Sequence, residues 1–61
     1  MTMAQYDALI EILSNGERYK AYDLNIAKRT VVSTAKRGWI GVDAKGHAFV
    51  TDAGMSALAA L

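Results

Sequence analysis

The 61-residue chain contains no cysteine, and this absence limits how so short a sequence can be stabilised. Without cysteine there are neither disulfides nor thiolate zinc sites, and the single histidine cannot build a metal site from imidazoles alone. A chain of this length buries only about 60% of the surface that its unfolded form exposes. We therefore expect one small domain over residues 1–61, held together by side-chain packing, with no cofactor and no metal.

The apolar residues do not form a membrane span, because no run of them approaches the ~20 residues that a span requires. No cationic start is followed by an apolar stretch, so the sequence shows no secretory signal. A Gly-rich phosphate loop is missing, and so small a domain has little room for a substrate cleft. We expect a cytoplasmic protein that is not an enzyme and does not associate with membranes.

The charges are divided unevenly along the chain, although the net charge is only +1. All seven Lys and Arg residues lie between positions 18 and 45, together with only two of the six acids, so this segment carries +5. The flanking segments hold the other four acids and no cation. A solvated surface usually mixes both signs, so this segregation predicts a polyanionic partner for the central segment.

The N-terminal segment has the pattern of an amphipathic helix with an acidic outer face. Thr2 and Gln5 have the spacing of a capping box, in which each side chain satisfies a backbone N–H of the first turn. The predicted core-facing stripe comprises Tyr6, Leu9, Ile10 and Leu13. Asn15 and Gly16 tolerate the left-handed conformation that closes a helix, so we expect the helix to end there.

Two further helices are expected in the central part of the chain. A short helix is predicted over residues 21–27, and a cationic and hydroxylic helix over residues 28–37. The narrow apolar stripe of the latter comprises Val31, Val32 and Ala35. Its β-branched residues 30–32 would also suit a strand. We favour the helix, because strict alternation fails and Gly38 provides a helix stop.

The C-terminal third is expected to form a hairpin and one more helix. Residues 39–43 and 47–50 are β-prone runs, and Gly46 in the spacer between them can adopt a positive φ. Thr51 then supplies an N-cap for a helix over residues 53–61. The predicted inward-facing residues of this helix are Met55, Leu58 and Leu61.

Three motifs occur in an order and spacing that resemble compact winged helix-turn-helix DNA-binding proteins of bacterial and phage type. The motifs are Arg29-Thr30-Val31, Ala35-Lys36-Arg37-Gly38-Trp39-Ile40 and Phe49-Val50-Thr51-Asp52-Ala53-Gly54. The resemblance covers about residues 5–58 and implies an α+β, mainly α fold: three helices, a two-stranded β-hairpin wing and a short C-terminal helix. It also implies that the helix at about 28–37 enters the major groove of double-stranded DNA, while the wing at about 39–50 touches the DNA backbone.

Carried onto this sequence, the resemblance implies a set of DNA-contacting residues. From the recognition helix these are Arg29, Thr30, Ser33, Thr34 and Arg37, and from the wing tip Lys45 and His47. Phosphate contacts, which position a protein without reading sequence, are expected from Lys20, Lys28 and Lys36. Independently of any family, arginine can pair bidentately with guanine, and serine or threonine can bind base edges or phosphates. We therefore predict a sequence-specific DNA-binding protein, acting as a transcriptional regulator or in a related DNA transaction such as excision.

The sequence leaves several alternatives open. The basic helix could be an ordinary solvated face, the wing tip an ordinary turn, and Trp39 either a core residue or a base-stacking one. The same fold also serves protein-interaction adaptors, for instance a phage-type protein that docks on a host factor.

Association with a second copy is a further open question. Because 52% of the residues are hydrophobic, some apolar surface is expected to remain exposed on the terminal helices. The candidates for this exposure are Met1, Met3, Ile12, Leu58 and Leu61. A homodimer through these helices and a monomer are both compatible with the sequence.

Overall fold

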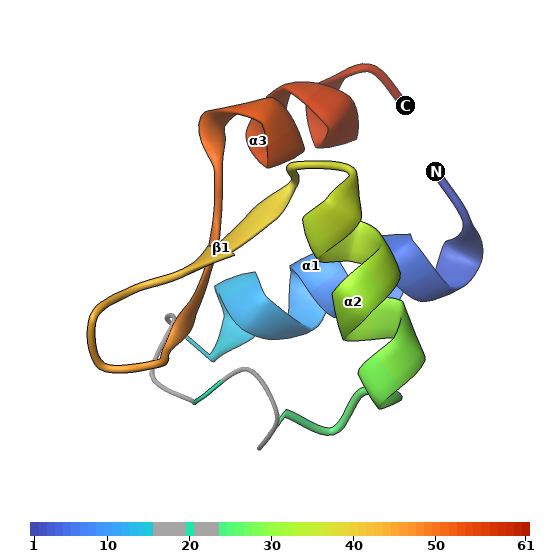
Figure 1. Cartoon of the computed structure of the whole chain (residues 1–61). Coiled ribbons are helices and arrows are strands. Elements are labelled where there is room, and N and C mark those ends of the chain that lie inside the picture. Colours follow the sequence, from blue (N-terminus) through green and yellow to red (C-terminus); the bar gives the residue numbers. More distant parts are fainter. Residues whose placement is uncertain (16–19, 21–23) are drawn as a thin grey trace.

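The structure is a computed structural model that describes residues 1–15, 20 and 24–61. Within this part of the chain, three helices and one antiparallel hairpin follow one another as shown in Figure 1. The elements are α1 (Met3–Ser14), α2 (Lys28–Lys36), β1 (Ile40–Val42), β2 (Ala48–Val50) and α3 (Asp52–Ala59). The expected α+β class with mainly helical content is confirmed.

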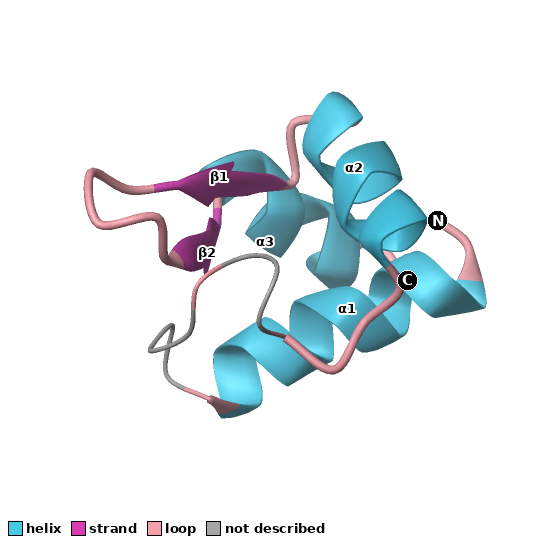
Figure 2. Ribbon diagram, turned by 60° about the horizontal axis from the view of Figure 1, so that its bottom comes forward, coloured by secondary structure: helices cyan, strands magenta, loops and turns pink. Residues whose placement is uncertain are grey.

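The hairpin supplies the surface on which the helices meet. α1 packs against α2 and β2, and α3 packs against β2. Ile40 pairs with Val50 and Val42 pairs with Ala48 across the hairpin. In Figure 2 the turn of the hairpin extends away from the helices. The two ends of the chain lie on the same side of the molecule (Figure 1).

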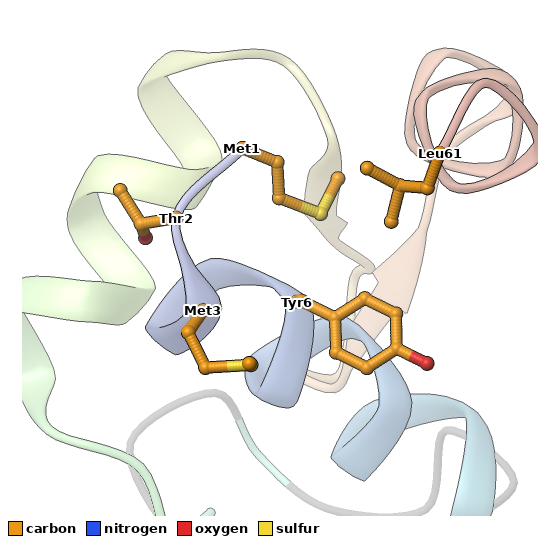
Figure 3. A pocket seen from close by; sticks show the side chains of 5 residues that line it. All are labelled: Met1, Thr2, Met3, Tyr6 and Leu61. Carbon is orange, nitrogen blue, oxygen red and sulfur yellow. The ribbon is translucent and has the colours of Figure 1, made fainter.

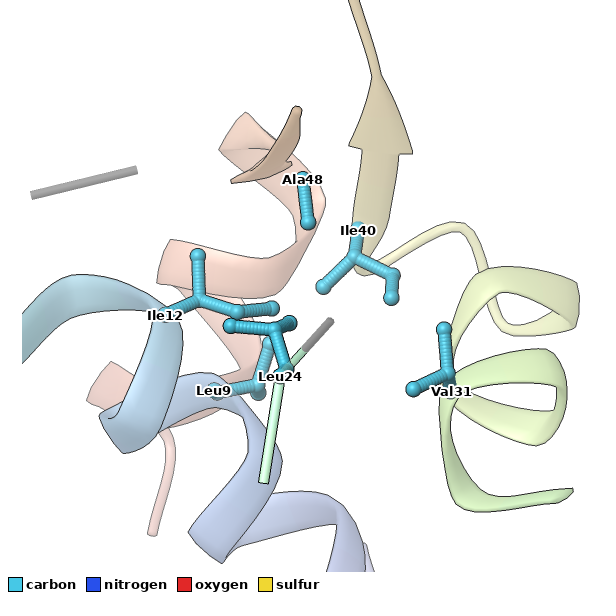
Figure 4. Close-up of a cluster of buried hydrophobic side chains, with 6 residues drawn as sticks. All are labelled: Leu9, Ile12, Leu24, Val31, Ile40 and Ala48. Carbon is cyan, nitrogen blue, oxygen red and sulfur yellow. The ribbon is translucent and has the colours of Figure 1, made fainter. Parts of the chain in front are cut away.

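The core takes only one or two side chains from each contributing segment. Its enclosed members are Leu9, Ile12, Leu24, Val31, Ile40 and Ala48, which point toward one another in Figure 4. Partly buried residues packed around them are Ile26, Trp39, Val50 and Leu58. Full burial of an aliphatic side chain contributes about 1.5–3 kcal/mol, so each member of so small a core matters for stability.

Side-chain caps fix where α1 and α3 begin, as the sequence predicts. The N–H of Gln5 donates to Thr2 Oγ1 at 3.1 Å, and the N–H of Thr2 donates to Gln5 Oε1 at 2.9 Å. The hydroxyl of Thr51 accepts the N–H of Gly54 at 3.0 Å and donates to the carbonyl oxygen of Gly38 at 2.6 Å. Thr51 therefore caps α3 and also ties it to the chain that leaves α2.

Two glycines make the turns that the sequence assigns to them. Gly38 follows Arg37, the C-cap of α2, with a φ of 78°, and Gly46 in the hairpin turn has a φ of 83°. Both angles lie in the left-handed region, which side chains disfavour. The predicted helix stop and the predicted turn are thus confirmed.

α1 turns a different face to the core from the one that its periodicity predicts. Of the four residues in the predicted stripe, only Leu9 is buried. The structure buries Gln5, Ala8 and Ile12 beside it, although Ile12 was a candidate for exposure. α1 carries two apolar stripes, and a periodicity count favours the one with larger side chains. Close packing against β2 instead selects the face that includes the small Ala8.

The short helix predicted over residues 21–27 is wrong in the part that the structure describes. Residues 24–27 are not helical, and residues 21–23 lie outside the described residues. Leu24 is buried in the core and Ile26 packs against it. Residues two apart do not share a face of a helix, so a bent segment is what brings both side chains to the core.

The inward faces of α2 and α3 are narrower than expected. Val31 is buried, but Val32 and Ala35 are exposed. Leu58 packs against the core as predicted, whereas Met55 and Leu61 are exposed. α3 ends at Ala59, so the C-terminal leucine does not share the helical face on which it was placed.

Candidate nucleic-acid interface

α2 meets the core through a narrow face and presents a polar one to solvent. Its buried residues are Val31 and Thr34. The opposite stripe follows the helical spacing i, i+3, i+4 and i+7. This exposed α2 stripe consists of Arg29, Val32, Ser33 and Lys36. No acidic residue occurs in α2, so the stripe is cationic and hydroxylic except at one valine.

Thr34 lies on the buried face, and the prediction that it contacts DNA is wrong. Its side chain is 0% exposed, and its hydroxyl donates to the carbonyl oxygen of Thr30 at 2.6 Å. A hydroxyl that bonds within its own helix can be buried at low cost. The carbonyl oxygen of Thr34 also accepts the N–H of Trp39 at 3.3 Å. Thr34 therefore joins α2 to the hairpin.

Ser33 is exposed but is held in place by contacts within the fold. Its hydroxyl donates to the carbonyl oxygen of Thr30, itself half-buried, at 3.1 Å. Ser33 Oγ also accepts an amide hydrogen from Gln5 Nε2 of α1 at 3.5 Å. A hydroxyl has two acceptor lone pairs, so Ser33 keeps accepting capacity toward a ligand. The sequence predicts Gln5 only as part of a cap and gives no sign of this contact.

The cations at the two ends of α2 are exposed, as the prediction requires. Lys28 begins the helix, while Lys36 and Arg37 end it. The two C-terminal cations lie at the negative end of the helix dipole, which favours them. The guanidinium carbon of Arg37 lies 5.9 Å from the centroid of the Trp39 ring, a cation–π distance. Trp39 itself packs against the core, which is one of the two roles that the sequence leaves open for it.

Three predicted contacts come together at the turn of the hairpin, and we call them the hairpin-tip cluster: Lys20, Lys45 and His47. Lys20 forms an antiparallel bridge with His47. The side chain of Lys20 passes close to Gly46. Its Cγ lies 3.9 Å from the position that a Cβ atom would have on this glycine, which is an ordinary van der Waals distance. The structure thus brings a lysine from before α2 to a turn that follows β1.

Asp43 stabilises the turn that carries this cluster. Its Oδ1 accepts the N–H of Lys45 at 2.8 Å and the N–H of His47 at 2.9 Å. The hydrogen bond from His47 is the main cause that lowers the pKa of the Asp43 carboxyl below its usual value. Desolvation is the second-largest cause and raises this pKa, while the N–H of Lys45 and the nearby charges lower it by smaller amounts. The Asp43 carboxylate therefore holds the backbone of the turn at Lys45 and His47.

Arg29 borders a groove that the sequence does not indicate. The groove has a volume of about 360 Å³ and lies between α1 and the segment that leads into α2. Asp7 and Glu11 of α1 line it on one side and Asn25 on the other. The predicted acidic outer face of α1 thus lies next to the first arginine of α2. Arg29 therefore belongs to the exposed α2 stripe and also borders the acidic groove.

The structure divides the remaining predicted contacts into two groups. One group follows α2, and the other is the hairpin-tip cluster, at the turn of the hairpin. Figures 1 and 2 show this turn extending away from α2. Within residues 1–15, 20 and 24–61, no group of three His, Cys, Asp or Glu side chains could hold a metal ion. Both groups place side chains with hydrogen-bond donors at the surface.

Comparisons with protein-family models, curated proteins and solved structures find no match to this chain. Among the described helices, none is both long enough and apolar enough to cross a membrane.

Proposed function

We propose that the protein is a small sequence-specific DNA-binding domain that inserts α2 into the major groove and rests the hairpin tip on the phosphate backbone. The observation that carries this proposal is the character of α2. Its exposed stripe offers Arg29, Ser33 and Lys36, and the helix contains no acid. Phosphates attract such a surface without regard to sequence, and arginine and serine side chains can also bind base edges.

The order of the elements supports a winged-helix arrangement as part of the proposal. A first helix is followed by the strand-like residue Lys20, then by α2, the hairpin and a last helix. In winged-helix proteins the hairpin after the recognition helix makes the second DNA contact. Lys20, Lys45 and His47 supply cationic and titratable groups at this hairpin.

The dimensions of α2 suit the groove. A helix with its side chains is about 10–12 Å across, and the major groove is about 12 Å wide. The nine residues of α2, at about 1.5 Å each, give about 14 Å of helix to lie in it. Arg29 and Ser33 lie side by side on the exposed stripe and are the residues that we assign to base edges. Lys36 and Arg37 at the helix end, with the hairpin-tip cluster, are assigned to phosphates.

The test is a titration of the isotope-labelled protein with duplex DNA at low salt, followed by NMR. We expect the amide signals of residues 28–37 and 44–47 to shift, and the binding constant to fall as salt rises, with a log–log slope of about −0.9 per phosphate contact. Arg29→Ala should weaken binding by about 5- to 100-fold if it pairs with a base. Lys36→Ala should reduce the salt slope by about 1.

A matched control separates local contacts from total charge. Ser56→Asp lowers the net charge by one unit, as each alanine variant does, at an exposed position of α3. It should leave binding almost unchanged. If Ser56→Asp weakens DNA binding as much as Lys36→Ala, the interface is not α2. Unmoved signals at both groups would overturn the proposal, and a salt-resistant complex with a protein would favour the adaptor function instead.

A further inference from the structure

One apolar residue interrupts the cationic and hydroxylic surface of α2. Val32 lies on the exposed α2 stripe, with Arg29 three positions before it and Lys36 four positions after it. It is 38% exposed and is the one exposed large hydrophobic residue of this helix. α2 joins the core through Val31 and Thr34, and Val32 is not among the partly buried residues that pack around the core. The contacts that hold α2 in the fold therefore do not require a valine at position 32.

Val32 is also separate from the other exposed apolar side chains of the described residues. These lie on α1, on the hairpin, on α3 and at the two ends of the chain. At the ends, Met1, Tyr6 and Leu61 border a hollow of about 310 Å³, shown in Figure 3, and none of the residues that line it belongs to α2. The neighbours of Val32 on the stripe are two cations and a serine. A ligand of α2 thus meets one apolar group within a surface of hydrogen-bond donors.

The major groove of DNA contains one apolar group that matches this pattern. Base pairs present hydrogen-bond donors and acceptors there, and thymine in addition presents its C5-methyl group. A valine side chain has no hydrogen-bonding atom, so it gains from contact with that methyl group. Against any other base edge it would displace water from a donor or acceptor without replacing the hydrogen bond, which is unfavourable. An exposed valine on a helix in the major groove therefore favours thymine over the other bases.

We propose that Val32 packs against the methyl group of a thymine and so specifies a T·A pair at one position of the DNA site. This inference rests on the proposed function, because it takes α2 as the helix that enters the major groove. Three residues advance about 4.5 Å along a helix, and bases on one DNA strand are about 3.4 Å apart. The thymine should therefore lie within about two base pairs of the base that Arg29 contacts.

The test compares thymine with uracil, which lacks the C5-methyl group and keeps the same hydrogen-bonding groups. The wild-type chain is first used to select a binding site from a pool of random-sequence DNA duplexes. Uracil then replaces each thymine of the selected duplex in turn, and the binding constant is measured by fluorescence anisotropy at low salt. We expect one replacement to weaken binding about three- to fivefold, which is the effect of exposing one methyl-sized apolar group.

Variants of two valines show whether Val32 makes the contact. Val32→Ala removes both γ-methyl groups and should bind the thymine and uracil duplexes almost equally. Val32→Ile keeps a branched apolar side chain and should retain the preference for thymine. Val42→Ala makes the same truncation at an exposed valine of the hairpin and should also retain it. Circular dichroism should show that all three variants remain folded.

The outcomes separate the role of Val32 from the proposed function. If the chain enriches no duplex from the pool, DNA binding and this inference both fail. If a duplex is selected but no thymine-to-uracil replacement weakens binding, the inference fails and DNA binding stands. The same conclusion follows if Val32→Ala discriminates between thymine and uracil as strongly as the wild-type chain does.

Discussion

The helices α1 and α2 are attached to the fold in different ways. α1 places Leu9 and Ile12 in the middle of the core, where both are almost completely enclosed. α2 contributes one valine and one threonine. Two longer hydrogen bonds add to this attachment: Gln5 Nε2 donates to Ser33 Oγ at 3.5 Å, and the carbonyl oxygen of Thr34 accepts the N–H of Trp39 at 3.3 Å.

This difference shows how a very small domain can combine a packed interior with a cationic exposed surface. Apolar burial is concentrated in α1, whereas α2 adds Val31 to the core and makes two longer hydrogen bonds. Substitutions on the outer face of α2 should therefore alter binding without altering the fold. Substitutions on the inner face of α1 should do the opposite.

The largest expected effect comes from truncating the anchor of α1. Leu9→Ala removes a fully buried side chain and should cost about 2–5 kcal/mol in the free energy of unfolding. A domain of this size has only a few kcal/mol in total, so the variant should be largely unfolded at 25 °C. Val32→Ala on the outer face of α2 should change stability by less than about 0.5 kcal/mol. Urea denaturation followed by circular dichroism measures both. Similar losses for the two variants would remove the distinction between the helices.

A smaller effect separates the two hydroxyl residues at neighbouring positions of α2. Thr34→Ala removes a buried methyl group and a buried hydrogen bond and should cost about 1–2 kcal/mol. Ser33→Ala, at an exposed position with a long bond to Gln5, should cost less than about 0.5 kcal/mol. In a DNA-binding assay the order should reverse once each variant is corrected for the folded fraction. A DNA-binding loss confined to Thr34→Ala would show that α2 is rotated relative to this structure.

The smallest effect concerns pH and the hairpin tip. The pKa of Asp43 is lowered in the folded chain from its usual value of 3.8, so its carboxylate contributes stability that is fully present above that value. This contribution is lost as the pH falls through the lower folded-state pKa. The difference in stability between the wild-type chain and Asp43→Ala should therefore be larger at pH 6 than at pH 2.5. NMR titration of the Asp43 carboxyl checks the pKa directly. A constant difference over this range would mean that the charge of Asp43 does not matter for the turn.

Much of the secondary structure, including the helix caps and turns, could be predicted from short-range sequence signals. Each of the two caps joins residues three positions apart, Thr2 with Gln5 and Thr51 with Gly54, so a short stretch of sequence contains both partners. Each turn glycine only has to adopt its own positive φ. The helix predicted for residues 24–27 is wrong, although the apolar spacing of these residues fits a helix. Leu24 and Ile26 both contact the core, and a helix would place their side chains on different faces.

The candidate interface was only partly predictable, for the same reason. The cationic and hydroxylic character of α2 is present in the sequence, and Ser33 and Lys36 are exposed as expected. Thr34 was assigned to the wrong face of α2, because the residue type alone does not indicate whether a threonine side chain faces solvent or the core. The position of Lys20 at the hairpin tip depends on its bridge with His47, which is far away in the sequence. No local sequence pattern indicates such a contact.

By itself, the sequence determined the helix caps, the turns, the segregation of charge and the cationic nature of α2, because each depends on residue type and short spacing. The tertiary structure alone decided which of two apolar stripes of α1 enters the core, which hydroxyl of α2 is buried, and which cations gather at the hairpin tip. These choices depend on side-chain volume and on contacts between distant segments. A helix with two apolar stripes can enclose only one of them in the core, and the other stays partly exposed.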